Sequence, residues 1–118
     1  MERHNWTAIP EEKMNPLLSR RVIHTEQLTI ARLWLGKGSV VPLHKHVNQQ
    51  VTMLQSGTLE FEMGETGKER FVLNAGDVVV IPPHMPHRVV ALEDSTATDL
   101  FTPAREDWIR GDDAYLRE

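Results

Sequence analysis

Three histidines and a glutamine have the residue types and part of the spacing that a metal site needs. His44 and His46 are separated by one residue, and in a β-strand residues two apart project from the same face. Gln50 has the same parity and falls on that face if no bulge intervenes, while His87 stands much later, at the start of another β-rich run. Imidazole is the commonest metal ligand. The alternative interpretation is that His44 and His46 are surface residues beside a turn.

The elements that must position these residues are short β-strands separated by turns. Between Thr58 and Met63, for example, Leu59 and Phe61 alternate with glutamates, which predicts a strand with one buried and one solvent-exposed face. Such runs predict a sandwich or barrel. The expected strands cover residues 20–24, 27–35, 40–46, 49–55, 58–63, 70–73, 78–81, 87–92 and 96–101.

Length and composition restrict the kind of protein. The chain has 118 residues, no cysteine and a formal net charge of -4, so we expect one domain without disulfides or thiolate ligands. The acidic balance argues against nucleic acid and against a polybasic membrane anchor. The first residues do not resemble a signal peptide, and the longest apolar run, 78–81, is far too short to span a membrane. We therefore expect a cytoplasmic protein without membrane or nucleic-acid partners.

The chain is expected to divide into three parts. Residues 1–19 carry two prolines and several charges and are predicted to form an extended arm. Residues 20–102 hold all the expected strands of the barrel. Residues 103–118 form a helical tail, in which Thr102 would cap a short helix, Pro103 would open it and Gly111 would end it.

Two spaced strings of residues surround the metal-ligand candidates. The first runs through Gly38, His44, His46, Gln50 and Gly57. The second runs through Gly76, Pro82, His84 and His87. Together they resemble the two motifs of the cupin superfamily, over roughly residues 20–102. Gln50 stands where most members carry Glu, His84 replaces a glycine of the second motif and Ala91 replaces its final Asn.

This resemblance implies an all-β fold, a single antiparallel β-barrel or jelly roll of the RmlC-like type. It also implies one divalent metal ion at His44, His46, Gln50 and His87, and no organic cofactor. Gln49 would point away from the histidines in a regular strand. These ligands leave nickel, iron, zinc, manganese and cobalt open. Because all four ligands are neutral, the ion keeps its full charge, which favours anionic ligands and Lewis-acid chemistry over redox chemistry.

A second group of residues follows on the last expected strand. Asp99 and Phe101 share parity, and Arg105 lies just beyond Pro103. The segment from Asp99 to Trp108 resembles the KdgF family of cupins, which linearise 4,5-unsaturated monouronates. That family often places its Gln one residue further from the second His.

This second resemblance implies catalytic roles for three residues. Asp99 would act as general acid and base, Phe101 would pack on the sugar, and Arg105 would bind its carboxylate through a bidentate pair. The other interpretation is that Asp99 is solvated, Phe101 belongs to the core, and Arg105 pairs with Glu106 or Asp107.

The sequence therefore predicts a metal-dependent, non-redox enzyme acting on a small anionic carbohydrate, most specifically the ring opening of a uronate. The alternatives are a cupin dioxygenase and a non-catalytic cupin that binds a metal or small molecule. We also expect a homodimer, since a small barrel has exposed sheet surface to cover. The roles of Arg32, a second anion ligand or a solvated residue, and of His84 stay open.

Overall fold

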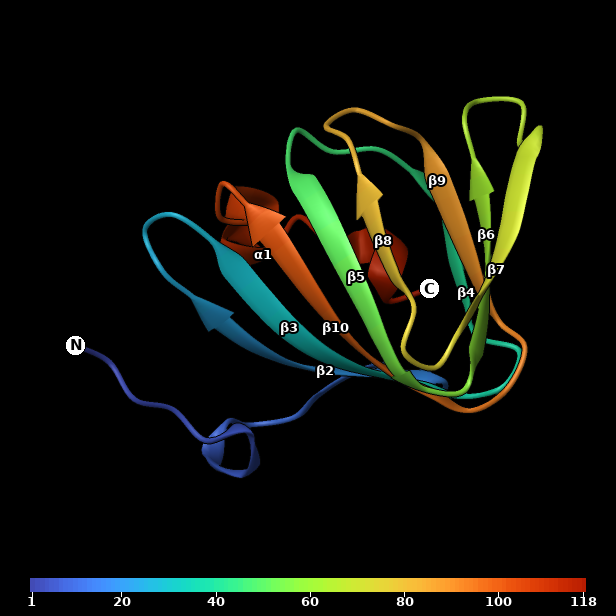
Figure 1. The fold of residues 1–118 in the computed structure, drawn as a ribbon. Helices are drawn as coiled ribbons and strands as arrows, with labels where there is room; N and C mark the ends of the chain where they lie inside the picture. The colour runs from blue at the N-terminus through green and yellow to red at the C-terminus, as the bar shows by residue number, and fades with distance from the viewer.

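The computed structural model of the protein describes residues 1–118 and folds them into two antiparallel β-sheets that face each other (Figure 1). The six-stranded sheet has the order β1 (Glu12–Asn15), β2 (Leu18–His24), β3 (Thr29–Leu35), β10 (Ser95–Thr102), β5 (Gln49–Ser56) and β8 (Val78–Ile81). The four-stranded sheet has the order β4 (Val40–His44), β9 (His87–Ala91), β6 (Thr58–Met63) and β7 (Glu69–Asn74). The predicted all-β jelly roll is confirmed.

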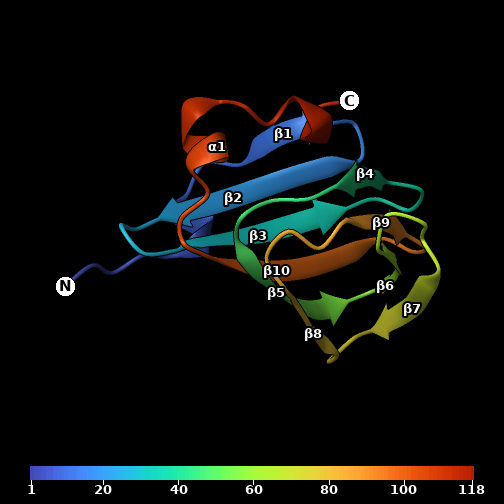
Figure 2. The ribbon, with the colours of Figure 1, turned by 90° about the horizontal axis from the view of Figure 1, so that it is seen from above.

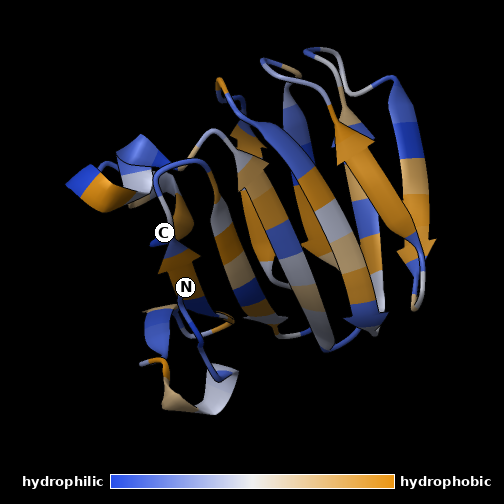
Figure 3. Cartoon of the chain, turned by 60° about the vertical axis from the view of Figure 1, so that its left-hand side comes forward, coloured by the Kyte–Doolittle hydropathy of each residue, from blue (hydrophilic) through white to orange (hydrophobic).

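The hydrophobic core fills the space between the sheets. Along β6, Leu59, Phe61 and Met63 are buried, while Glu60 and Glu62 are partly exposed, as the alternation predicts. Along β10, Ala97, Asp99 and Phe101 take the buried positions. Hydrophobic and hydrophilic bands succeed one another along several of the strands (Figure 3). The inner face of the central strand β10 is thus the place where a carboxylate enters an otherwise apolar interior.

The chain joins the sheet earlier than the predicted extended arm of residues 1–19 implies. The arm contains a 3-10 helix, η1 (Trp6–Ala8), and strand β1, which pairs antiparallel with β2. Strand β2 already begins at Leu18. The physical reason is that Met14 and Leu18 are buried, so this stretch contributes to the core rather than lying free.

The helical tail begins later than predicted. Strand β10 runs through Thr102, which pairs with Gln49 of β5, so Thr102 belongs to the ladder and does not cap a helix. Helix α1 covers Glu106–Arg110 and has no side-chain cap at its start. Its predicted end is confirmed, because Gly111 follows in the left-handed conformation, with φ of 81°.

The tail packs against the six-stranded sheet beside β1 and β2 (Figure 2). A second 3-10 helix, η2 (Ala114–Leu116), follows α1. Trp108 and Leu116 are buried, while Ile109 is half exposed. Asp113 accepts a hydrogen bond of 2.6 Å from Nη2 of Arg20 on β2, and both side chains are buried. None of the helices is both long enough and apolar enough for a membrane crossing.

The outer face of the six-stranded sheet carries a row of aliphatic side chains. Neighbouring strands pair them in register: Ile23, Ile30, Leu100, Val51 and Val80. A second copy of the chain would cover such a row, but the homodimer stays a prediction.

Candidate metal centre and its cavity

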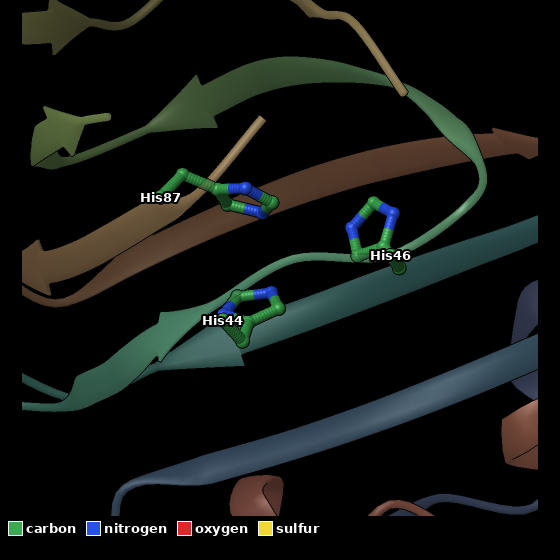
Figure 4. Close-up of side chains that lie close together, drawn as sticks. All are labelled: His44, His46 and His87. Carbon is green, nitrogen blue, oxygen red and sulfur yellow. The ribbon is translucent and has the colours of Figure 1, made fainter. Parts of the chain in front are cut away.

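Three histidine side chains converge between the two sheets (Figure 4). His44 ends β4 and His87 begins β9, and the two are direct partners in the antiparallel ladder. His46 lies in the loop after β4. One nitrogen from each ring lies within 4.8 Å of the others, a spacing that could hold a metal ion. The sequence therefore identified a real cluster, although its members come from two strands and a loop.

The parity argument for His44 and His46 is wrong in its detail. Strand β4 ends at His44 and its pairing with β9 is irregular between Val41 and His44, so the two histidines do not share a regular strand. The loop is held because buried Asn48 donates from Nδ2 to the carbonyl oxygen of Pro103, at 2.6 Å. The buried side chain of Asn48 therefore fixes the loop in place, as strand pairing would have done.

The hydrogen bonds of the three rings define their tautomers. Each ring directs Nδ1 at a main-chain carbonyl oxygen two residues away: His44 at Pro42 (2.7 Å), His46 at Asn48 (3.1 Å) and His87 at Met85 (2.8 Å). A carbonyl only accepts, so in His44 and His87 Nδ1 carries the proton and Nε2 keeps a free lone pair. This arrangement is typical of metal-binding histidines.

Burial keeps these rings neutral. It lowers the pKa of His44 to about 3 and that of His46 to about 4, and neighbouring cationic or imidazole groups act in the same direction. Burial also lowers the pKa of His87. The Nε2 atom of His87 is buried and has no hydrogen-bond partner, which is costly unless another group satisfies it. Neutral imidazoles with free lone pairs are the form that a metal requires.

Gln50 reaches the cluster from β5, opposite the histidine loop. Its Oε1 lies 3.0 Å from Nε2 of His46, while its Nε2 donates to Oγ1 of Thr52 at 2.9 Å and lies 3.5 Å from Oδ2 of Asp99. The neutral ring of His46 has one proton but directs both nitrogens at oxygen acceptors, so a proton on Nδ1 leaves the lone pairs of its Nε2 and of Gln50 Oε1 facing each other. A cation bound by both atoms would resolve this, so the residues present fit a divalent metal. Gln49 is exposed.

Gln50 does not share a strand with the histidines, so the expected common face is wrong. It points inward because β5 alternates, with Gln50, Thr52 and Leu54 on the buried side. The four predicted ligands still face one region.

Asp99 is buried beside the amide of Gln50. Its Oδ1 accepts a 2.7 Å hydrogen bond from Thr52, its partner on the neighbouring strand β5. Burial raises the pKa of Asp99 to about 6, although the hydrogen bond from Thr52 and the charge of Arg105 lower it. Phe101 follows on the same face and is also buried. The expectation that both side chains enter the barrel is therefore met, and the solvated alternative for Asp99 is not.

Arg105 is buried and already makes the bidentate pair expected for a substrate. Its Nε and Nη2 donate to the two carboxylate oxygens of Asp107, at 2.9 and 2.8 Å. Its guanidinium also lies 4.6 Å from the ring centre of Phe101 and 4.5 Å from that of Trp108. These hydrogen bonds leave Nη1 unused, so the fork that the sequence analysis assigned to substrate is occupied by Asp107.

One cavity joins these groups. Its walls come from both sheets and from the tail, and include His44, His87, Gln50, Asp99, Phe101, Arg105 and Tyr115, with apolar side chains deeper in the barrel. Arg32 lies elsewhere, on the outer sheet face with Trp34, and its guanidinium is 5.9 Å from the ring of Trp6. His84 is an exposed turn residue with a positive φ of 63°, at the position where the resemblance expects glycine.

Sequence reasoning gave three polar residues of this region no part in the chemistry. Thr52 shares the parity of Gln50 and could have been found on that ground. Asp107 was considered only as the partner that would keep Arg105 away from chemistry. Tyr115 had no spacing signal at all, because η2 is brought to the cavity by packing of the tail.

Comparisons with known proteins agree with this geometry. A family profile described as "Cupin domain" matches residues 32–102. The structure of KdgF from a Halomonas species is similar, with 33% identity, a TM-score of 0.76, and coverage of 84% of this chain and 92% of that one. An RmlC-like cupin from Shewanella frigidimarina has 27% identity, a TM-score of 0.81, and coverage of 89% and 93%.

More distant structures share the fold alone. Oxalate decarboxylase from Bacillus subtilis has 18% identity and a TM-score of 0.76, with coverage of 85% of this chain and 28% of that one. No curated protein sequence matches the chain.

Proposed function

Because the chain belongs to the cupin domain family, we propose that it is a metal-dependent enzyme that opens the ring of a small 4,5-unsaturated monouronate. The observation that carries the proposal is the buried carboxylate of Asp99, whose Oδ2 lies 3.5 Å from the amide of the proposed ligand Gln50. A cavity that only stored a metal would not need an acid at this position. The resemblance to uronate-linearising cupins and the 33% identity to KdgF from Halomonas support the substrate class.

We assign the metal to His44, His46, Gln50 and His87. A divalent ion there would supply positive charge that polarises oxygen atoms of the sugar. Three imidazoles and an amide add no negative charge, so this centre differs from the two-histidine, one-carboxylate sites of many iron oxygenases. That difference in donor chemistry favours a non-redox reaction over the dioxygenase alternative.

The chain's own residues would handle the proton. Ring opening of such a sugar removes a proton from the hydroxyl on its anomeric carbon, breaks the bond to the ring oxygen and adds a proton to the double bond, so the product is an isomer. Oδ1 of Asp99 is held by Thr52, which leaves Oδ2 to accept and return the proton. A carboxylate whose environment raises its pKa is suited to both steps.

Phe101 and Arg105 would shape the surroundings of this acid. Phe101 lies two residues beyond Asp99 on the same face of β10. It forms an apolar wall that excludes water from the reacting region. Arg105 contributes a fixed positive charge to the cavity, because Asp107 holds its orientation. That charge attracts the substrate carboxylate without requiring the bidentate pair.

The direct test uses the metal-loaded protein and an unsaturated monouronate released from pectin by a lyase. Activity appears as loss of the ultraviolet absorbance of the conjugated double bond, and metal-stripped protein is the control. We expect loss that depends on protein and on metal. Absence of turnover with all five candidate metals, nickel, iron, zinc, manganese and cobalt, contradicts the proposal.

A further inference from the structure

Tyr115 brings a hydroxyl group to the metal cavity from an element far away in the sequence. Its ring centre lies 4.8 Å from that of His44, tilted by 30°. Its Oη accepts a 2.7 Å hydrogen bond from Nη2 of Arg105. Tyr115 lines the same cavity as Asp99 and Gln50, so a ligand there meets this side chain.

The proton of this hydroxyl is unused. Arginine carries only donors, so the bond between Arg105 and Tyr115 uses a lone pair of Oη and not its hydrogen. The structure gives that hydrogen no acceptor. A hydroxyl that receives a hydrogen bond from a cation and retains its own proton is a good donor to an oxygen with negative charge.

Two anchors hold the hydroxyl in place. Asp107 orients the guanidinium of Arg105 through two hydrogen bonds, and Arg105 then holds Oη. The segment η2 is itself tied down, because buried Asp113 pairs with Arg20 and the carbonyl oxygen of Leu116 accepts from Nδ2 of Asn15 at 3.1 Å. A donor that is oriented before binding loses little entropy when the ligand arrives.

We infer that Tyr115 is a ligand-binding residue, which donates a hydrogen bond to an oxygen of a carboxylate bound in the metal cavity. Arg105 acts as a positioning residue, since it holds and polarises the phenol while Asp107 occupies its own fork. The ligand class, a small carboxylate such as a monouronate, rests on the proposed function. The placement of the Tyr115 hydroxyl in the cavity does not depend on the proposed function.

The chain has a single tyrosine, which makes the test direct. Protein grown with 3-fluorotyrosine and loaded with zinc gives one fluorine resonance, and it is titrated with two probes, galacturonate and acetate. We expect the resonance to shift and saturate with each. By calorimetry, Tyr115→Phe weakens galacturonate binding about tenfold, the effect of one hydrogen bond to a charged group.

Three measurements separate this role from a structural one. Zinc content of Tyr115→Phe should match that of the parent, and its melting temperature should fall only slightly, because Nη2 of Arg105 keeps Asp107 as a partner. Trp34→Phe is the matched control, because this aromatic residue lies on the outer sheet face and its change should leave affinity intact. Loss of affinity in both variants would contradict a specific role for Tyr115.

The outcomes also distinguish this inference from the proposed function. The role of Tyr115 is overturned if the parent and Tyr115→Phe bind galacturonate equally and the fluorine resonance of the parent does not shift. The proposed function then still stands. A resonance that follows acetate but ignores galacturonate supports the role of Tyr115 and contradicts the uronate class. If neither carboxylate binds the zinc-loaded protein, both are overturned.

Discussion

Thr52 donates a 2.7 Å hydrogen bond to Oδ1 of Asp99 across the neighbouring strands β5 and β10. The same Thr52 oxygen accepts from Nε2 of Gln50, at 2.9 Å. These two bonds form a hydrogen-bond relay with a fixed direction. The amide of Gln50 donates to the hydroxyl of Thr52, and this hydroxyl donates to the carboxylate of Asp99. As a result the carbonyl oxygen of Gln50, and not its nitrogen, faces His46.

This relay predicts that Thr52 controls metal affinity without touching the metal. Thr52→Val keeps the shape of the side chain but removes the acceptor that orients the Gln50 amide, so we expect affinity for zinc to fall about tenfold. Thr52→Ser restores the hydroxyl and should restore affinity. Competition with a coloured chelator measures both. Equal affinity in Thr52→Val and the parent contradicts the relay.

Metal binding itself is tested on the histidines. We expect one divalent ion per chain by elemental analysis, with most of it lost in His46→Ala because that ring and Gln50 face each other at 3.0 Å. The double variant His44→Ala/His46→Ala should bind almost none. A double variant that kept a full equivalent would show that the ion sits elsewhere.

Gln50→Glu tests the charge argument. A carboxylate is a better donor to a hard or borderline cation than an amide, so metal binding should be kept or strengthened near neutral pH. The added negative charge stands next to Asp99 and lowers the net positive charge of the centre, which should weaken galacturonate binding. Calorimetry on zinc-loaded protein checks this, and tighter galacturonate binding would refute the electrostatic reasoning.

Much of the fold could be predicted from the sequence, because alternation and turn residues are local signals. Nine of the ten strands match expected runs to within a few residues. Strand β1 and the start of β2 were missed because Met14 and Leu18 are buried in one core cluster with Trp108 and Leu116 of the tail, which lies far along the chain. Pairing of Thr102 in the ladder overrode a local helix-start signal for the same reason.

The candidate site was predictable in its members but not in its geometry. Spacing strings and the family resemblance named the histidines and Gln50, yet the loop that carries His46 and the inward turn of Gln50 come from packing. The bond between Arg105 and Asp107 joins residues only two apart, whereas Tyr115 reaches Arg105 through packing of the tail, which no periodicity encodes. Of the two interpretations of Arg105, the structure shows the pairing with Asp107.

Because Arg20 pairs with Asp113, we expect the free energy of unfolding to fall at acid pH. Burial alone raises the pKa of Asp113, but hydrogen bonds from Arg20 and Arg117 outweigh it, so the pKa lies below its usual value of 3.8. A carboxyl with a depressed pKa stabilises the fold above its unfolded pKa, and this stability is lost as the pH falls below that value. Asp113→Asn leaves the buried charge of Arg20 with only its longer contact to Glu12, at 3.4 Å, and should cost about 3 kcal/mol at neutral pH.

Urea unfolding of the parent and Asp113→Asn, repeated at falling pH, measures this difference. We expect the gap in unfolding free energy to shrink on the acid side, where the parent carboxyl takes up its proton. Asp112→Asn is the control, because this neighbouring side chain is exposed and its change should cost less than about 1 kcal/mol. A gap that stays constant with pH contradicts the assignment.

Asp99→Asn separates the catalytic role of Asp99 from its place in the relay. An amide has no carboxylate to accept the proton, so turnover of the unsaturated uronate should fall by about 10²–10⁴ at full metal content. The Oδ2 position lies 3.5 Å from the amide nitrogen of Gln50, and an amide nitrogen placed there would also disturb that ligand. Loss of the proton acceptor lowers turnover, whereas a disturbed Gln50 lowers metal affinity.

Thr52→Val supplies the comparison, because it keeps the carboxylate of Asp99 but removes the hydroxyl that accepts from Gln50 and donates to Oδ1 of Asp99. If Asp99 only orients Gln50, both variants lose metal to a similar extent, and saturating metal restores the turnover of both. If Asp99 transfers the proton, saturating metal restores part of the turnover of Thr52→Val, whose carboxylate has lost only its hydrogen bond from Thr52, and leaves Asp99→Asn slow. Turnover of metal-saturated Asp99→Asn at the parent rate would remove Asp99 from the chemistry, whatever happens to its melting temperature.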